Sequence, residues 1–114
     1  MKKTLEVNDE YNELKKIMEE IRWKVLNKPH KNENGPDMVV TNEYTAYRIE
    51  IKVARKLKSG SWQVKPVEEN RKNDDFIAIK VGKMWVFREM SEHLKLCSGN
   101  GYNSVTKLYR LLNN

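Results

Sequence analysis

The sequence contains a single cysteine, Cys97, and no long run of apolar residues. One cysteine excludes an intramolecular disulfide and a cysteine-rich zinc site, and it favours a reducing, cytoplasmic location. No segment approaches the roughly 18 apolar residues that a membrane span needs. The basic start, Met1 to Thr4, is not followed by the apolar stretch of a signal peptide. The sequence therefore disfavours secretion and membrane insertion.

Common catalytic motifs are also missing. The sequence has no Walker A pattern, and nothing in it resembles a serine–histidine–aspartate or cysteine–histidine nucleophile set. The two histidines, His30 and His93, are far apart and have no partner at metal-ligand spacing. We therefore assign neither histidine a role.

Basic residues are in excess. The 22 lysines and arginines outnumber the 16 aspartates and glutamates, which gives a net charge of +6 and an isoelectric point near 9.4. This balance favours an anionic partner such as nucleic acid, although a solvated lysine-rich surface has the same composition. With 39% hydrophobic and 33% charged residues and no repeat or linker, residues 1–114 are expected to form one domain with a modest core.

The N-terminal part of the sequence predicts an amphipathic helix from Asn8 to about Asn27. Its apolar residues recur at helical spacing, with lysine and glutamate on the opposite side. The apolar residues are Tyr11, Leu14, Ile17, Met18, Ile21 and Val25. Asn27-Lys28-Pro29 should end the helix before a polar loop over residues 30–36.

Five later segments have the properties of strands. They are residues 37–40, 44–54, 61–64, 76–79 and 84–87. The first two flank a turn, the third stops before Pro66, and the last two surround Gly82, which suits the first central position of a type II′ hairpin turn.

The C-terminal part predicts two helices. Ser91 offers an N-cap for a short helix through Leu96, and a final helix would carry an apolar face. That face consists of Val105, Leu108, Tyr109 and Leu112. Residues 67–73 and 97–103 are expected to be irregular. Together these elements predict an α+β fold with a mixed, mainly antiparallel sheet of four or five strands, flanked by an N-terminal helix and C-terminal helices.

The strand over residues 44–54 has two unlike faces. Since residues i and i+2 of a strand point the same way, Glu50 and Lys52 should lie side by side. Asp37 begins the preceding strand. Mg²⁺ prefers oxygen ligands, and a nearby lysine can orient or deprotonate a water, so these residues supply the parts that phosphodiester hydrolysis needs. The alternative is that Glu50 and Lys52 form only an exposed row of charges.

Pro36-Asp37, twelve intervening residues and then Glu50-Ile51-Lys52 resembles the signature of the PD-(D/E)xK nuclease superfamily. The expected elements over residues 8–112 are similar to that superfamily's restriction-endonuclease-like core. The resemblance implies that Asp37, Glu50 and the carbonyl of Ile51 bind Mg²⁺, for which Mn²⁺ could substitute. It implies also that Lys52 assists the attacking water.

The superfamily often adds a metal-linked glutamate from its first helix. On a helical projection Glu10 falls within the apolar stripe and Glu13 at its edge. A carboxylate there is costly unless something binds it, which makes Glu10 a candidate metal ligand. The alternative is a solvated Glu10 favoured by the helix dipole.

Other polar residues near the expected site are candidates for contact with DNA. They are Lys56, Lys58, Gln63, Arg71 and Lys72, each of which could equally be an ordinary surface residue. The loop over residues 98–103 could present backbone N–H groups to a phosphate or be a simple turn. Asp74-Asp75 is expected to be a turn before a strand rather than a metal pair, and Trp62 and Trp85 are expected in the core.

The function that these features favour is a Mg²⁺-dependent DNA endonuclease acting on duplex or branched DNA, with a homodimer supplying two active sites. The sequence departs from the archaeal Holliday-junction-resolvase pattern after Lys52, where residues 62–66 replace an expected helix. The substrate therefore stays open. The alternatives are a non-catalytic nucleic-acid-binding module and a small viral or plasmid-encoded regulatory protein.

Overall fold

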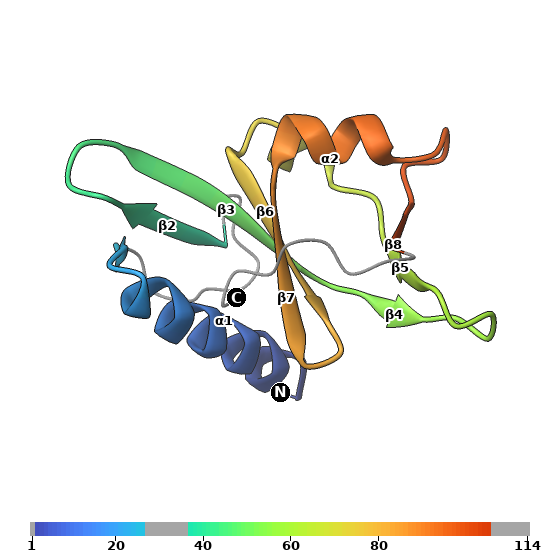
Figure 1. The fold of residues 1–114 in the computed structure, drawn as a ribbon, viewed down its shortest axis with the longest axis horizontal. Coiled ribbons are helices and arrows are strands. Elements are labelled where there is room, and N and C mark those ends of the chain that lie inside the picture. The colour runs from blue at the N-terminus through green and yellow to red at the C-terminus, as the bar shows by residue number, and fades with distance from the viewer. Residues whose placement is uncertain (1, 27–36, 106–114) are drawn as a thin grey trace.

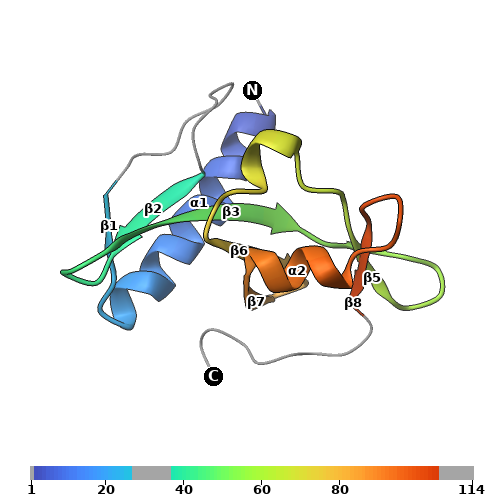
Figure 2. The same cartoon turned by 90° about the horizontal axis from the view of Figure 1, so that it is seen from above.

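A five-stranded sheet lies between two helices. The computed structural model describes residues 2–26 and 37–105, with side chains for 9–26 and 37–104. Helix α1 (Lys2–Glu20) covers one face of the sheet and the shorter α2 (Met90–Leu96) packs on the other, as the two perpendicular views show (Figure 1, Figure 2).

The main sheet is mixed. Its strands, in spatial order, are β1 (Lys24–Val25), β2 (Met38–Thr41), β3 (Ala46–Val53), β6 (Phe76–Val81) and β7 (Met84–Glu89). Strands β3 and β6 are parallel, and the other neighbours are antiparallel. The predicted α+β class with a mainly antiparallel mixed sheet is thus confirmed.

A second, smaller sheet lies beside the main one. It consists of β4 (Arg55–Lys56), β5 (Trp62–Val64) and β8 (Asn103–Val105), all antiparallel. The β4–β5 hairpin extends away from the main body (Figure 1). A short 3₁₀ helix, η1 (Glu69–Arg71), occupies part of the segment predicted to be irregular.

Two hydrophobic clusters lie on opposite faces of the main sheet, because alternate residues of a strand point to opposite sides. Between α1 and the sheet, Leu14 and Met18 of the helix pack with Ala78 and Trp85 of the sheet. On the other face Ile77 belongs to a cluster with Val64 and Met90, against which Trp62 packs. Trp85 is 1% exposed and lies in the core as predicted, whereas Trp62 is half-buried and packs against the edge of its cluster.

Helix α1 ends at Glu20, earlier than the predicted end near Asn27. The N–H of Trp23 donates to the carbonyl of Met18 at 2.9 Å, and the N–H of Arg22 donates to that of Glu19 at 3.1 Å. These two bonds form a Schellman motif around Arg22, whose φ of 73° is left-handed. The expected helical stripe was therefore wrong at its end: Ile21 is 41% exposed, and Val25 lies in β1.

The turn between β6 and β7 agrees with the predicted type II′ hairpin turn. Gly82 has a φ of 65° while Lys83 has no positive φ, as a type II′ turn requires. Ser91 is not the N-cap of α2, because the helix begins at Met90 and the extended residue before it is Glu89.

Val105 lies in β8 rather than in a helix, since it pairs with Trp62. The rest of the predicted final helix, and the predicted loop over 30–36, fall outside the described residues.

No helix in the described ranges 2–26 and 37–105 is long and apolar enough to cross a membrane.

Candidate active site

Asp37 and Glu50 lie opposite each other on neighbouring strands. In the β2–β3 ladder Met38 pairs with Ile49. One further step in this antiparallel register brings Asp37 opposite Glu50, and residues directly opposite share a face of the sheet. The backbone N–H of Ile51 donates a 2.9 Å hydrogen bond to Oδ2 of Asp37, which holds the two acidic residues at one place.

Glu50 is a buried acid, 5% exposed, and its Oε1 has no hydrogen-bond partner among the described residues. The pKa of the Glu50 carboxyl is raised to about 8, first by burial and then by the charge of the Asp37 carboxylate, while the charge of Lys52 opposes the rise. A hydrogen bond between the side chains of Glu50 and Asp37 also favours the protonated form. Nζ of Lys52 lies 3.8 Å from Oε2 of Glu50, so the predicted side-by-side arrangement is present.

Asp74 is a third acid near this pair, and no pattern in the sequence assigned it to the site. It is 5% exposed, and Nη1 of Arg71 lies 3.5 Å from its Oδ1. Burial raises the pKa of Asp74, and the charge of Asp37 adds to the rise. Asp74 and Asp75 form a bend directly before β6, as the expected turn requires, and Oδ2 of Asp75 accepts a 2.8 Å hydrogen bond from the N–H of Arg48. Parallel pairing of β3 with β6 is the signal that would have placed Asp74 here.

The chemistry of these residues fits a hard divalent cation. Buried carboxyl groups that repel one another are stabilised when a cation lies between them. Among residues 9–26 and 37–104, no group of three or more histidine, cysteine, aspartate and glutamate side chains has metal-binding geometry. Mg²⁺ needs only one or two carboxylates, completed by waters and a substrate phosphate, so Asp37 and Glu50 are a sufficient pair. The unpartnered Oε1 of Glu50 is an available oxygen.

The two glutamates of α1 have different surroundings. Glu13 forms an ion pair with Nζ of Lys80. Glu10 is half-buried, and α1 packs on the face of the sheet opposite to Glu50. A metal-binding role for Glu10 stays a prediction, as does that of the Ile51 carbonyl.

The candidate DNA-contacting residues fall into two groups. Lys56, Lys58 and Gln63 belong to the β4–β5 hairpin, where Nζ of Lys56 lies 5.9 Å from the Trp62 ring centroid and Gln63 accepts a 3.1 Å hydrogen bond from Arg55. Arg71 and Lys72 lie at η1: Arg71 faces Asp74, and Nζ of Lys72 is 3.1 Å from Oε1 of Glu69. Their contact with DNA stays a prediction.

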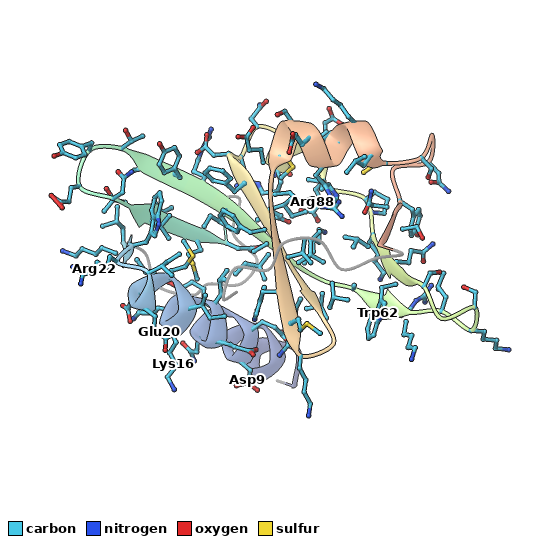
Figure 3. All side chains as sticks on the ribbon, in the orientation of Figure 1. Asp9, Lys16, Glu20, Arg22, Trp62 and Arg88 are labelled. Atoms are coloured by element: carbon cyan, nitrogen blue, oxygen red, sulfur yellow. The ribbon has the colours of Figure 1, made fainter. Side chains whose placement is uncertain are left out.

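A buried polar cluster on the Glu50 face joins β7, α2 and β8. Nη1 of Arg88 donates to Nδ1 of His93 at 3.0 Å and to Oδ1 of Asn103 at 3.1 Å, and Nδ2 of Asn103 donates to the Leu96 carbonyl at 3.0 Å. Burial lowers the pKa of His93 to about 4, helped by the charges of Arg88 and Lys52, so this histidine is neutral at physiological pH. Figure 3 shows Arg88 below α2, far from the labelled residues of α1.

Comparison with known proteins finds solved structures with a similar fold. No protein-family model matches the sequence, and no curated protein sequence matches it. A bacterial homing endonuclease, I-Ssp6803I, superposes with a TM-score of 0.66 at 15% identity, covering 90% of this chain and 75% of its own. Hjc, a Holliday junction resolvase from the archaeal hyperthermophile Archaeoglobus fulgidus, gives a TM-score of 0.56 at 13% identity, covering 85% of each chain. Both are restriction-endonuclease-like nucleases, and the chain shares their fold.

Proposed function

We propose that this chain, which has the restriction-endonuclease-like fold, is a metal-dependent endonuclease that hydrolyses DNA phosphodiester bonds. The proposal rests on one observation above all. Asp37 and Glu50 share a face on adjacent strands, and Lys52 lies 3.8 Å from Glu50 on that face. This is the order and geometry that the resemblance to PD-(D/E)xK nucleases requires.

Each residue of the proposed site has a separate task. A bound Mg²⁺ or Mn²⁺ supplies Lewis-acid stabilisation of charge on the phosphoryl oxygens. Asp37 and Glu50 would hold that ion, with the Ile51 carbonyl as an additional candidate ligand. Lys52 orients the attacking water, takes part in its deprotonation or neutralises charge that develops on the phosphate.

DNA is the proposed partner because both structural neighbours are named for activity on DNA, a homing endonuclease and a Holliday junction resolvase. Duplex and branched DNA are therefore both candidate substrates. Lys56, Lys58 and Gln63 on the projecting hairpin are proposed to contact the backbone phosphates, together with Arg71 and Lys72 near the acidic site.

A homodimer is part of the proposal, because the chain carries one candidate active site and cutting both strands of a duplex calls for two. The cytoplasmic location proposed for the protein rests on its cysteine content alone.

The proposal is tested by incubating the protein with supercoiled, linear and branched DNA in Mg²⁺ or Mn²⁺. Wild type is compared with Asp37→Ala, Glu50→Ala and Lys52→Ala, and with Asp9→Ala, which removes an exposed acid of α1. We expect cleavage by the wild type and by Asp9→Ala only.

Equal cleavage by all variants would exclude the site. A wild type that shifts DNA in a gel without cutting it under either metal would favour a non-catalytic binding module. Neither binding nor cleavage would favour a protein-interaction role.

A further inference from the structure

We infer that Asp74 is a third acidic member of the cation site, which strengthens cation binding by its charge without ligating the ion directly. This inference rests on the proposed function, since it concerns the same site. The sequence pattern D…ExK does not include Asp74. Asp74 is placed in the cation site only by the three-dimensional arrangement of the chain.

The topology brings acids to both sides of β3. Asp37 approaches Glu50 from β2, on one side of β3. Asp74 approaches from the other side, because it closely precedes β6, which runs parallel to β3. The N–H of Asp75 donates a 3.0 Å hydrogen bond to the carbonyl of Arg48, so the segment that carries Asp74 is attached to β3 two residues before Glu50.

The Asp74 side chain is buried and incompletely satisfied. It is 2% exposed, and its Oδ2 has no hydrogen-bond partner among the described residues. Arg71 reaches only the other oxygen, at a long 3.5 Å. The second unpartnered buried carboxyl oxygen of the site is Oε1 of Glu50. Two such oxygens are costly in a protein interior unless a cation or a strong donor compensates them.

The three acids act on one another electrostatically. The hydrogen bond from Asp75 to Arg48 attaches the segment of Asp74 to β3 beside Glu50, and the Asp37 side chain is bonded to β3 at Ile51. A cation held by Asp37 and Glu50 would therefore lie near the Asp74 charge. Direct ligation by all three is not indicated, since no three acidic side chains in the described part of the chain have ligand geometry. An acid outside the ligand set acts through water and through space.

A purely structural role would make different predictions. If Asp74 served only to hold Arg71, then Arg71→Gln would reproduce the effect of losing Asp74. If Asp74 serves the cation, Asp74→Asn should weaken metal binding, whereas Arg71→Gln removes a competing positive charge and should leave metal binding as strong as in wild type or stronger.

The test is calorimetric titration of the metal-free protein with Mn²⁺ or Mg²⁺ in the absence of DNA, with melting temperatures measured in EDTA. We compare wild type, Asp74→Asn, Arg71→Gln and Asp37→Asn. Glu69→Gln is the matched control, because it removes an exposed carboxylate from the same segment. We expect Asp74→Asn to weaken metal affinity roughly 10- to 100-fold. The same variant should melt at or above the wild-type temperature in EDTA, since repulsion among buried acids is relieved. Glu69→Gln should match the wild-type affinity.

Wild-type affinity in Asp74→Asn, together with a weaker affinity in Asp37→Asn, would overturn the assignment of Asp74 and leave the proposed function standing. An equal reduction of metal affinity in Arg71→Gln would overturn it in favour of the structural role. A wild-type protein that binds neither cation at millimolar concentration would overturn the proposed function itself, and the role of Asp74 with it.

Discussion

The carboxylate of Asp37 accepts a 2.9 Å hydrogen bond from the backbone N–H of Ile51, the residue between Glu50 and Lys52. This bond ties the Asp37 side chain to the backbone of β3, the strand that carries Glu50 and Lys52. Because a strand backbone is held on both sides by its ladder partners, the position of Asp37 relative to Glu50 is set before any ligand binds.

The raised pKa of Glu50 predicts a pH-dependent stability. The folded protein keeps this proton up to a pKa of about 8, whereas the unfolded chain releases it near 4.5. The contribution to stability is therefore complete below pH 4.5 and is lost as pH rises toward 8. Between pH 7 and 8 this one group should reduce the free energy of unfolding by roughly 1 kcal/mol in metal-free protein.

Glu50→Gln should abolish that contribution. The measurement is urea unfolding in EDTA at pH 7 and at pH 8, for wild type and variant. This window lies above the range in which His93 changes the stability, which extends from its folded pKa of about 4 to its ordinary value of 6.5. A wild type and a Glu50→Gln variant with the same change in stability over the window would show that Glu50 is already ionised at neutral pH.

Replacement of Lys52 should separate binding from chemistry. Lys52→Met keeps much of the length of the side chain and removes the ammonium group that stands 3.8 Å from Glu50. Cleavage should fall about 10²- to 10⁴-fold, the usual contribution of a general acid or base. Metal binding should persist at pH 8.5, where more of Glu50 is ionised. Single-turnover cleavage and metal titration on the same preparation check both parts, and undiminished cleavage would remove Lys52 from the mechanism.

Lysines of the β4–β5 hairpin should affect DNA binding through its salt dependence. Lys56 and Lys58 are exposed on this hairpin, which extends from the body of the molecule (Figure 1). If each lysine neutralises one phosphate, Lys56→Gln and Lys58→Gln should each reduce the slope of log K against log salt by about 0.9. Lys16→Gln on α1, which lies well away from Trp62 of the hairpin (Figure 3), is the control and should keep the wild-type slope. The readout is fluorescence anisotropy at several salt concentrations in Ca²⁺, and an unchanged slope in both hairpin variants would remove this hairpin from the DNA interface.

The end of α1 provides a prediction about stability. Arg22 has a φ of 73°, a conformation that glycine adopts without steric cost. Arg22→Gly should therefore stabilise the protein by roughly 0.5 to 1 kcal/mol. Lys16→Gly, in the middle of α1, should destabilise it by about 1 kcal/mol. Denaturant unfolding of the two variants checks the contrast, and destabilisation by both would mean that the Arg22 side chain contributes more than its backbone strain costs.

The relation between sequence and structure differs from element to element. Glu50 and Lys52 could be placed on one face because strand alternation is a local rule. Asp74 could not be placed, since its proximity to Glu50 depends on the parallel pairing of β3 with β6, which no local pattern encodes. The end of α1 was missed because a left-handed arginine carries none of the glycine signal that marks most such ends. Strand β8 was missed because three residues that pair with β5 show no periodicity of their own.

The central claim is that Asp37 and Glu50 together hold one divalent cation, and crystals soaked in Mn²⁺ test it most directly. We predict an anomalous difference peak at metal–oxygen bonding distance from both carboxylates, on the face of the sheet that carries Lys52. The same peak should be absent from Asp37→Asn crystals, because this variant lacks one of the two carboxylates that hold the cation. Clear density for both side chains with no peak between them, in a protein that still cleaves DNA in Mn²⁺, would contradict the claim.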